Sequence, residues 1–204
     1  MGVISNGTTL LDAGALDSGI ATGAMTLIKT LTASSATTLS FLNGADNVVF
    51  DDTYDVYVFK FINIKASNRS KSFSFQVDTG TNTNYNIAVT STGFEAYQNE
   101  AGNSTELRYD AQHDNPNSTG FVQISTELQE SSDSSGSGEL VFYNPSSGTF
   151  VKHWTSTSNN MRFDSHSYQY HKAGYFNTTT ALTRVQFKIN ANTFDGTIKM
   201  YGIK

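Results

Sequence analysis

Residues 72–78 read SFSFQVD, and the alternation of apolar and polar side chains along this stretch decides the fold class. Phe73, Phe75 and Val77 fall on one face of an extended chain, and the polar residues between them fall on the other. A period of two residues is typical of a β-strand with one buried and one solvated face. The stretch therefore predicts a strand with a dry face and a wet face.

Strand signals recur along the rest of the chain. Residues 184–190 (RVQFKIN) alternate in the same way. Residues 56–64 (VYVFKFINI) are apolar on both faces over most of their length, which predicts a central strand buried on both sides. Two further strands are predicted at 138–144 and 196–204.

Clusters of Gly, Asn, Asp and Ser separate these stretches, and such residues favour turns because they tolerate turn geometry or hydrogen-bond to their own backbone. The serine-rich residues 131–138 (SSDSSGSG) are interpreted as a mobile hairpin loop. No stretch of 11 or more residues shows helical spacing. We therefore predict an all-β fold in which residues 24–204 form a single β-sandwich, jelly-roll-like in its connections.

Residues 1–23 differ in composition from the rest of the chain. They are rich in Gly, Ala, Ser and Thr, and such a segment buries too little apolar surface to become ordered alone. We predict an extended N-terminal arm that docks on a neighbouring subunit; packing on its own domain is the alternative. The apolar residues expected to make this assembly contact are Leu10, Leu11, Leu16 and Ile20.

The composition indicates a folded chain without a basic surface. Charged residues make up 15% of the 204, but 14 Phe and 10 Tyr supply the material for a core. The net charge of −5 offers no basic face for phosphates, so we expect no nucleic-acid partner. The absence of cysteine excludes disulfides and thiolate metal ligands.

The sequence gives no membrane or secretion signal. No run approaches the roughly 18 apolar residues of a membrane span, so we expect no membrane insertion. The N-terminus lacks the basic and continuous apolar regions of a signal peptide. A protein that leaves its cell would therefore need another route, such as phage lysis.

No pattern in the sequence predicts an active site, and we expect no catalytic residue, no metal and no cofactor. There is no G-x-S-x-G nucleophile motif. The group Asp110, His113 and Asp114 is interpreted as an ordinary polar loop rather than a metal site. Glycoside hydrolysis needs two facing carboxylates, and nothing selects a pair among seven candidates. These are Asp51, Asp52, Asp55, Glu95, Glu100, Asp110 and Asp164.

Residues 150–176 concentrate aromatic side chains and hold three of the four histidines. Tyr, Trp and His suit surfaces that are half dry and half wet, so a subunit interface or core packing is the preferred interpretation. A sugar-binding face is the alternative. Core packing is expected for Phe150, Phe163 and Phe176. The candidate contact residues are His153, Trp154, His166, Tyr168, Tyr170 and Tyr175.

Several sequence blocks resemble small structural proteins from phages of marine and aquatic bacteria. Members of this group are described as tail-fibre-like or otherwise uncharacterised virion proteins. The resemblance implies membership of the particle and no enzymatic residues. The blocks that carry it are ISNGTTLLDAGAL at 4–16, MTLIKTLTAS at 25–34, YDVYVFKFINI at 54–64, GFEAYQNE at 93–100, FVKHW at 150–154, AGYFNTTTAL at 173–182 and GTIKMYGI at 196–203.

These observations lead to one expectation for function and one alternative. We expect a non-enzymatic virion protein, either a tail-fibre or appendage module or a capsid decoration protein, that forms a homotrimer and contacts other virion proteins. Contact with host surface glycans is a further expectation for the fibre-like form. The alternative is a soluble carbohydrate-binding module, which would be a monomer.

Overall fold

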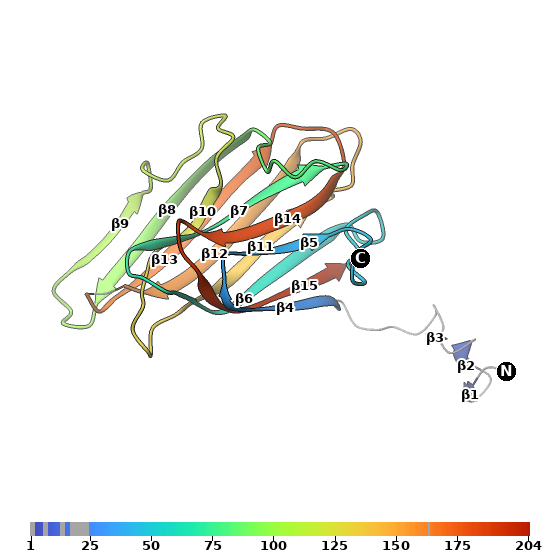
Figure 1. Cartoon of the computed structure of the whole chain (residues 1–204), viewed down its shortest axis with the longest axis horizontal. Helices are drawn as coiled ribbons and strands as arrows, with labels where there is room; N and C mark the ends of the chain where they lie inside the picture. The colour runs from blue at the N-terminus through green and yellow to red at the C-terminus, as the bar shows by residue number, and fades with distance from the viewer. Residues whose placement is uncertain (1–2, 6–7, 13–14, 17–24, 163) are drawn as a thin grey trace.

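A computed structural model describes residues 3–5, 8–12, 15–16, 25–162 and 164–204 of the chain (Figure 1). These residues contain fifteen β-strands, and none of them is helical. Two antiparallel sheets pack together as a sandwich. The prediction of an all-β sandwich is therefore confirmed.

The sandwich consists of one large and one small sheet. The large sheet has, from edge to edge, β4 (Thr26–Ala36), β15 (Phe194–Ile203), β6 (Val56–Ala66), β11 (Gly136–Tyr143), β12 (Lys152–Met161), β13 (His166–Phe176), β8 (Val89–Asn99) and β9 (Thr105–Tyr109). The small sheet has β10 (Val122–Leu128), β7 (Lys71–Thr79), β14 (Leu182–Ile189) and β5 (Thr38–Leu42). The large sheet is therefore twice as wide in strands as the small one.

The extra width comes from two hairpins. β8 and β9 enter the chain between β7 and β10, and β12 and β13 enter between β11 and β14. Both hairpins join the large sheet, where β13 pairs with β8. We call these four adjacent strands the hairpin half of the large sheet. It extends to the free edge at β9, which lies at the left of Figure 1.

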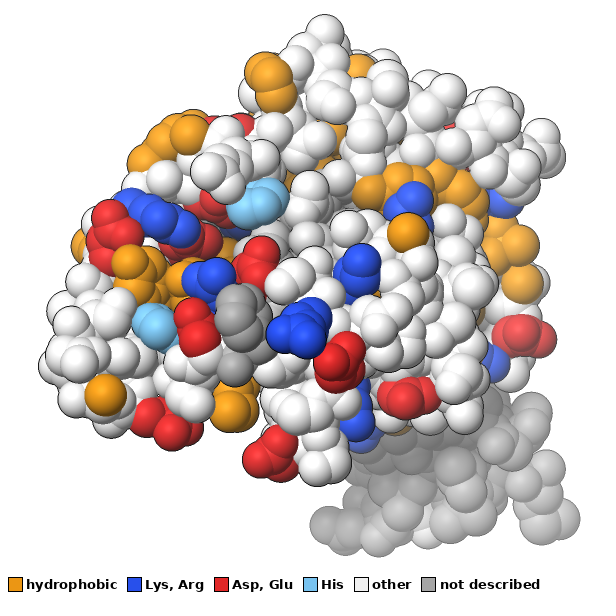
Figure 2. All heavy atoms as spheres, turned by 60° about the vertical axis from the view of Figure 1, so that its left-hand side comes forward, with side chains coloured by type: hydrophobic (Ala, Val, Ile, Leu, Met, Phe, Trp, Pro, Cys, Tyr) orange, Lys and Arg blue, Asp and Glu red, His pale blue; other side chains and the backbone are white. Residues whose placement is uncertain are grey.

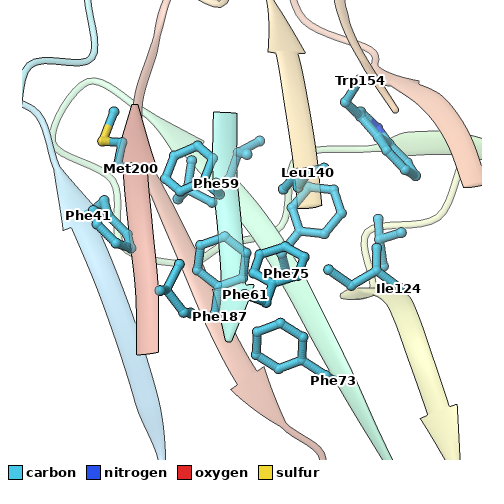
Figure 3. Packing of buried hydrophobic residues seen from close by; sticks show 14 of the residues in the cluster. Phe41, Phe59, Phe61, Phe73, Phe75, Ile124, Leu140, Trp154, Phe187 and Met200 are labelled. Atoms are coloured by element: carbon cyan, nitrogen blue, oxygen red, sulfur yellow. The ribbon is translucent and has the colours of Figure 1, made fainter. Parts of the chain in front are cut away.

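Aromatic side chains fill the space between the sheets (Figure 3). The rings of Phe61 in β6 and Phe73 in β7 lie 5.1 Å apart in an edge-to-face arrangement, and Phe73 stacks on Phe187 of β14 at 5.7 Å. Offset and edge-to-face pairs stabilise a core beyond the area they bury. The phenylalanines at alternating positions of the predicted strands therefore form the core, as their period indicates.

The prediction of a wet face on residues 72–78 is wrong. All of β7 from its second residue onward is buried, including its polar side chains. Gln76 donates hydrogen bonds to the carbonyls of Ile87 (3.1 Å) and Gly120 (2.9 Å), and Asp78 accepts one from the Tyr85 amide (2.9 Å). Loops therefore cover the outer face of the small sheet here and satisfy its polar groups.

Two other predictions about the strands need adjustment. β6 is central in its sheet, but its outer face is only partly covered, since Ile62 is exposed there and Lys60 is half-buried. The serine-rich residues 131–138 are not wholly loop, because β11 begins at Gly136. Gly138 lies so close to β12 that a Cβ there would be 2.3 Å from the carbonyl oxygen of Thr157.

The described N-terminal residues form a small sheet of their own, which lies outside the sandwich in Figure 1. β1 (Val3–Ser5), β2 (Thr8–Asp12) and β3 (Ala15–Leu16) pair in chain order and antiparallel. Leu10 and Leu11 belong to β2, and Leu11 is the register partner of Leu16. Ile20 lies outside the described residues. An extended arm is not confirmed, and the docking role of these residues stays a prediction.

Candidate functional site

The hairpin half of the large sheet presents two different faces. Along β12 and β13 side chains alternate, so Trp154 points inward while its neighbour His153 points outward. The inner face meets the small sheet, where β10 lies against β12. No other described strand covers the outer face. The face on which a predicted contact residue lies therefore decides whether it is buried or accessible.

Three predicted contact residues lie inside the protein. Trp154 is 1% exposed and meets the ring of Phe75 edge-to-face at 5.1 Å. Tyr168 and Tyr170 are buried, and the Tyr170 hydroxyl lies 2.7 Å from the hydroxyl of Thr126 in β10. The surface contact predicted for these three residues is therefore wrong, because the inner face of the sheet places them in the interior.

Of the other three predicted contact residues, two are brought together and the third lies apart. His153 and Tyr175 are register partners on the outer face, with ring centroids 6.0 Å apart. His166 lies at the start of β13, where its Nδ1 is 3.0 Å from the carboxylate of Asp164. The contact role stays a prediction for all three.

The phenylalanines of residues 150–176 also divide. Phe176 is buried and packs against Phe75 at 5.8 Å, which confirms its predicted place in the core. Phe150 is 67% exposed, so its predicted core position is wrong. Phe163 lies outside the described residues. The exposed phenylalanine belongs to the loop before β12, where no strand alternation fixes its direction.

Two hollows open on the outer face of the hairpin half. The first has a volume of about 330 Å³ and lies among Phe94, Tyr109 and His171. The second has a volume of about 340 Å³ and lies among Tyr143, His153 and Tyr175. Both share a floor made by Thr92, Thr155 and Ala173. We call these two adjoining hollows together the outer groove.

Aromatic side chains stand exposed along the outer groove. Phe94 is 48% exposed, and its ring stacks on that of His171 with centroids 4.9 Å apart. Tyr109 of β9 and Tyr143 of β11 are also exposed. Exposed apolar groups gathered in one depression mark a binding or interaction surface, whereas scattered ones need no explanation.

Hydroxyl groups in the outer groove are held by short side-chain contacts. The Tyr143 and Thr155 hydroxyls lie 3.1 Å apart, and Thr157 Oγ1 lies 3.4 Å from His171 Nδ1. Tyr109 receives a hydrogen bond from Thr92 at 3.5 Å and donates one to the carboxylate of Asp114. These contacts orient the groups and leave further donors and acceptors directed to solvent, because each hydroxyl both donates and accepts.

The inner face beyond β10 carries buried charges in place of phenylalanine. Glu95 is buried and accepts a hydrogen bond from Arg108 at 2.6 Å. Asp110 and Lys172 are both buried, with 2.7 Å between carboxylate and ammonium. Figure 2 shows acidic and basic side chains interleaved at this end of the molecule. Glu95, Asp110 and Lys172 are thus each paired with an opposite charge, as a low-dielectric environment requires.

Asp110 is held ionised by its partners. Burial opposes the charge, but the hydrogen bonds from His113, at 2.6 Å, and from Lys172 outweigh it and lower the pKa of Asp110 to about 2. Such a group stabilises structure and is poorly suited to proton transfer near neutral pH. Among the residues that the structure describes, no three His, Asp or Glu side chains converge to hold a metal.

The sequence alone did not identify Phe94, Tyr109 and Tyr143 as site residues. Each lies on a different strand, and only the pairing of β8, β9, β11 and their neighbours brings them to one face. His171 was noticed as part of an aromatic segment, but its partner Phe94 lies more than seventy residues earlier. The available signal was the alternation within each strand. It shows which residues of one strand share a face, but it does not show which strands are neighbours in the sheet.

Comparisons with known proteins add no family to what the structure shows, so a functional proposal has to start from these surfaces. The described part of the chain has no helix long and apolar enough to cross a bilayer. No protein-family model, no curated protein and no solved structure matched this chain.

Proposed function

We propose that this chain is a non-enzymatic structural subunit of a bacteriophage particle, acting as a homo-oligomer in a tail fibre, an appendage or a capsid decoration. A homotrimer that contacts other virion proteins, and host surface glycans in the fibre-like form, is the proposed assembly. The resemblance of its sequence blocks to phage structural proteins supports the proposal. The fold and one edge of the large sheet add physical support.

We interpret the sandwich as a jelly roll with two inserted hairpins. Without the hairpins, eight strands remain in chain order: β4, β5, β6, β7, β10, β11, β14 and β15. The first of these pairs with the last, and the second pairs with the seventh. The order across the sheets then follows the double Greek key found in viral capsid and lectin domains. This is an argument from fold alone, and it favours both the structural proposal and the lectin-like alternative.

The observation that carries self-association is the exposed edge strand β9. All five of its residues are exposed, and Leu107 is 71% exposed. An edge strand presents unpaired backbone groups, and proteins normally protect it with Pro, charged side chains or a covering segment. β9 has no Pro or Lys, and its two charged residues, Glu106 and Arg108, pair with each other while Arg108 also pairs with Glu95. No described strand covers its outer side. A second copy lying along β9 would pair this backbone and bury Leu107.

The mass in solution tests self-association. The full chain should sediment as a trimer, at three times the 22.2 kDa of one chain. Leu107→Lys should lower this mass, because a lysine on an edge strand opposes pairing. Phe150→Lys is the matched control, since Phe150 is as exposed but lies in a loop away from β9. A wild-type monomer, or equal effects of both variants, would contradict the assembly.

Particle membership needs a separate measurement. Antibodies against the chain should label purified, intact phage particles in electron micrographs, at sites that repeat with the symmetry of the fibre or the capsid. The same antibodies should not label particles lacking the gene. Particles that carry none of the chain would exclude the proposed function.

The second candidate function is a soluble carbohydrate-binding module. The outer groove favours it, because exposed aromatic rings beside hydroxyl groups suit a sugar. This alternative requires a monomer that never enters particles. The sedimentation and labelling experiments therefore separate the two candidates.

A further inference from the structure

We infer that the outer groove is a binding site for a neutral oligosaccharide. This inference rests on the proposed function in one respect only, which is that the host surface is the source of the oligosaccharide. The site itself follows from the shape of the groove, its exposed aromatic walls and its lack of charge, and the buried Tyr168 and Tyr170 do not line it.

The shape of the groove suits an elongated ligand. Its two hollows share a floor of Thr92, Thr155 and Ala173, so they adjoin each other across β8, β12 and β13. Each hollow is within the volume range of small-molecule sites. The floor side chains are small, which keeps the depression open between aromatic walls. A chain of linked rings would fill both hollows at once.

The walls suit the two kinds of surface that a sugar ring presents. The apolar C–H groups of a pyranose pack on aromatic rings, and Phe94 and Tyr143 stand exposed in different hollows. Sugar hydroxyls need directed partners, because a buried hydroxyl without one is costly. Thr155 and Thr157 offer oriented hydroxyls between the aromatic walls. The groove therefore combines an apolar surface with fixed polar groups.

The charge of the groove selects a neutral ligand. Its described lining contains no Asp, Glu or Arg. Lys172 borders the first hollow, but its ammonium is buried against Asp110 on the other face. Asp114 accepts the hydrogen bond of Tyr109 and adds negative charge beside the groove. A phosphate or sulfate group would find no accessible Lys or Arg side chain there, so an anionic glycan is disfavoured.

The test measures binding of purified full-length protein to an array of neutral and anionic oligosaccharides. We expect binding to neutral glucose-, galactose- or mannose-containing chains and little binding to sulfated ones. Isothermal titration with the best neutral oligosaccharide should then show that Phe94→Ala and Tyr143→Ala each weaken binding about tenfold, which corresponds to about 1.4 kcal/mol. Phe150→Ala is the matched control and should bind like the wild type, because Phe150 is exposed outside the groove.

Each other outcome has a definite meaning. Failure of all neutral oligosaccharides to bind, or unchanged binding by Phe94→Ala and Tyr143→Ala, overturns the inference. A lower sedimenting mass of these two variants without any sugar binding by the wild type overturns it in favour of a subunit interface. Thermal melting of each variant checks that it is folded. Particle labelling is independent of all these results, so failure of the sugar site and failure of the virion role are distinguishable.

Discussion

The two faces of β12 and β13 are both rich in aromatic residues, yet one is closed and the other is open. Trp154 and Tyr170 on the inner face are buried, whereas His153 and Tyr175 on the outer face remain accessible. The small sheet covers the first set, and no described strand covers the second. Residue type alone therefore does not assign an aromatic side chain to core or surface, because its odd or even position along the strand decides the face on which it lies.

The largest expected effect comes from the inner aromatic residue. Trp154→Ala should lower the free energy of unfolding by about 4 kcal/mol, because it removes a large buried ring and leaves a cavity against Phe75. The adjacent outward residue gives the control, and His153→Ala should cost less than about 0.5 kcal/mol. Urea denaturation followed by circular dichroism at equal protein concentration measures both. Similar costs for the two variants would break the distinction between the faces.

Breaking an ion pair on the inner face should also cost more stability than breaking one on the outer face. Lys172→Met should cost about 3 kcal/mol, because it leaves the buried carboxylate of Asp110 without its ammonium partner. Lys60 and Glu139 form a pair of 3.1 Å on the outer face, where both side chains are about half exposed to solvent. Lys60→Met should therefore cost no more than about 0.5 kcal/mol. Equal costs in urea titrations would show that the inner pair is not shielded from water.

Acid should destabilise the fold through protonation of Asp110 on the inner face. Its pKa in the folded protein is about 2, below the ordinary value of 3.8, so its ionisation stabilises the fold above pH 4. This contribution, about 2 kcal/mol, should be lost as the pH falls from 4 to 2. Stability measured by denaturation at several pH values should drop less steeply for Asp110→Asn than for the wild type. Parallel pH profiles would show that other carboxylates govern acid unfolding.

The fold class was predictable from the sequence because local alternation is enough to identify a strand. Residues 184–190 and 196–204 coincide closely with β14 and β15. The wet face expected on residues 72–78 failed for a reason that lies far along the chain. Loops that follow β7 and precede β10 cover that face, and the sequence near β7 carries no sign of them.

The site was predictable only in part, because it needs the pairing of distant strands. The aromatic richness of residues 150–176 was visible, and His153 and Tyr175 do border the outer groove. The sequence could not show that Trp154 and Tyr170 lie on the opposite, inner face. The sequence does not determine the length of the turn between β12 and β13, so the alternation in one strand could not be aligned with that in the other. Lys172 was also unpredictable as a buried charge, since its partner Asp110 reaches it through a loop after β9.

The smallest expected effect comes from removing a single tyrosine hydroxyl on each face. Burial raises the pKa of the Tyr170 phenol, so the group stays protonated and hydrogen-bonded to Thr126. Tyr170→Phe should cost about 1 kcal/mol, because it leaves a buried hydroxyl of Thr126 without this partner. Tyr143 makes the same kind of contact with Thr155 at 3.1 Å, but water can replace it on the open face. Tyr143→Phe should therefore leave the urea midpoint unchanged. An equal loss of stability in both variants would mean that the outer face is covered in solution by something that the isolated chain does not provide.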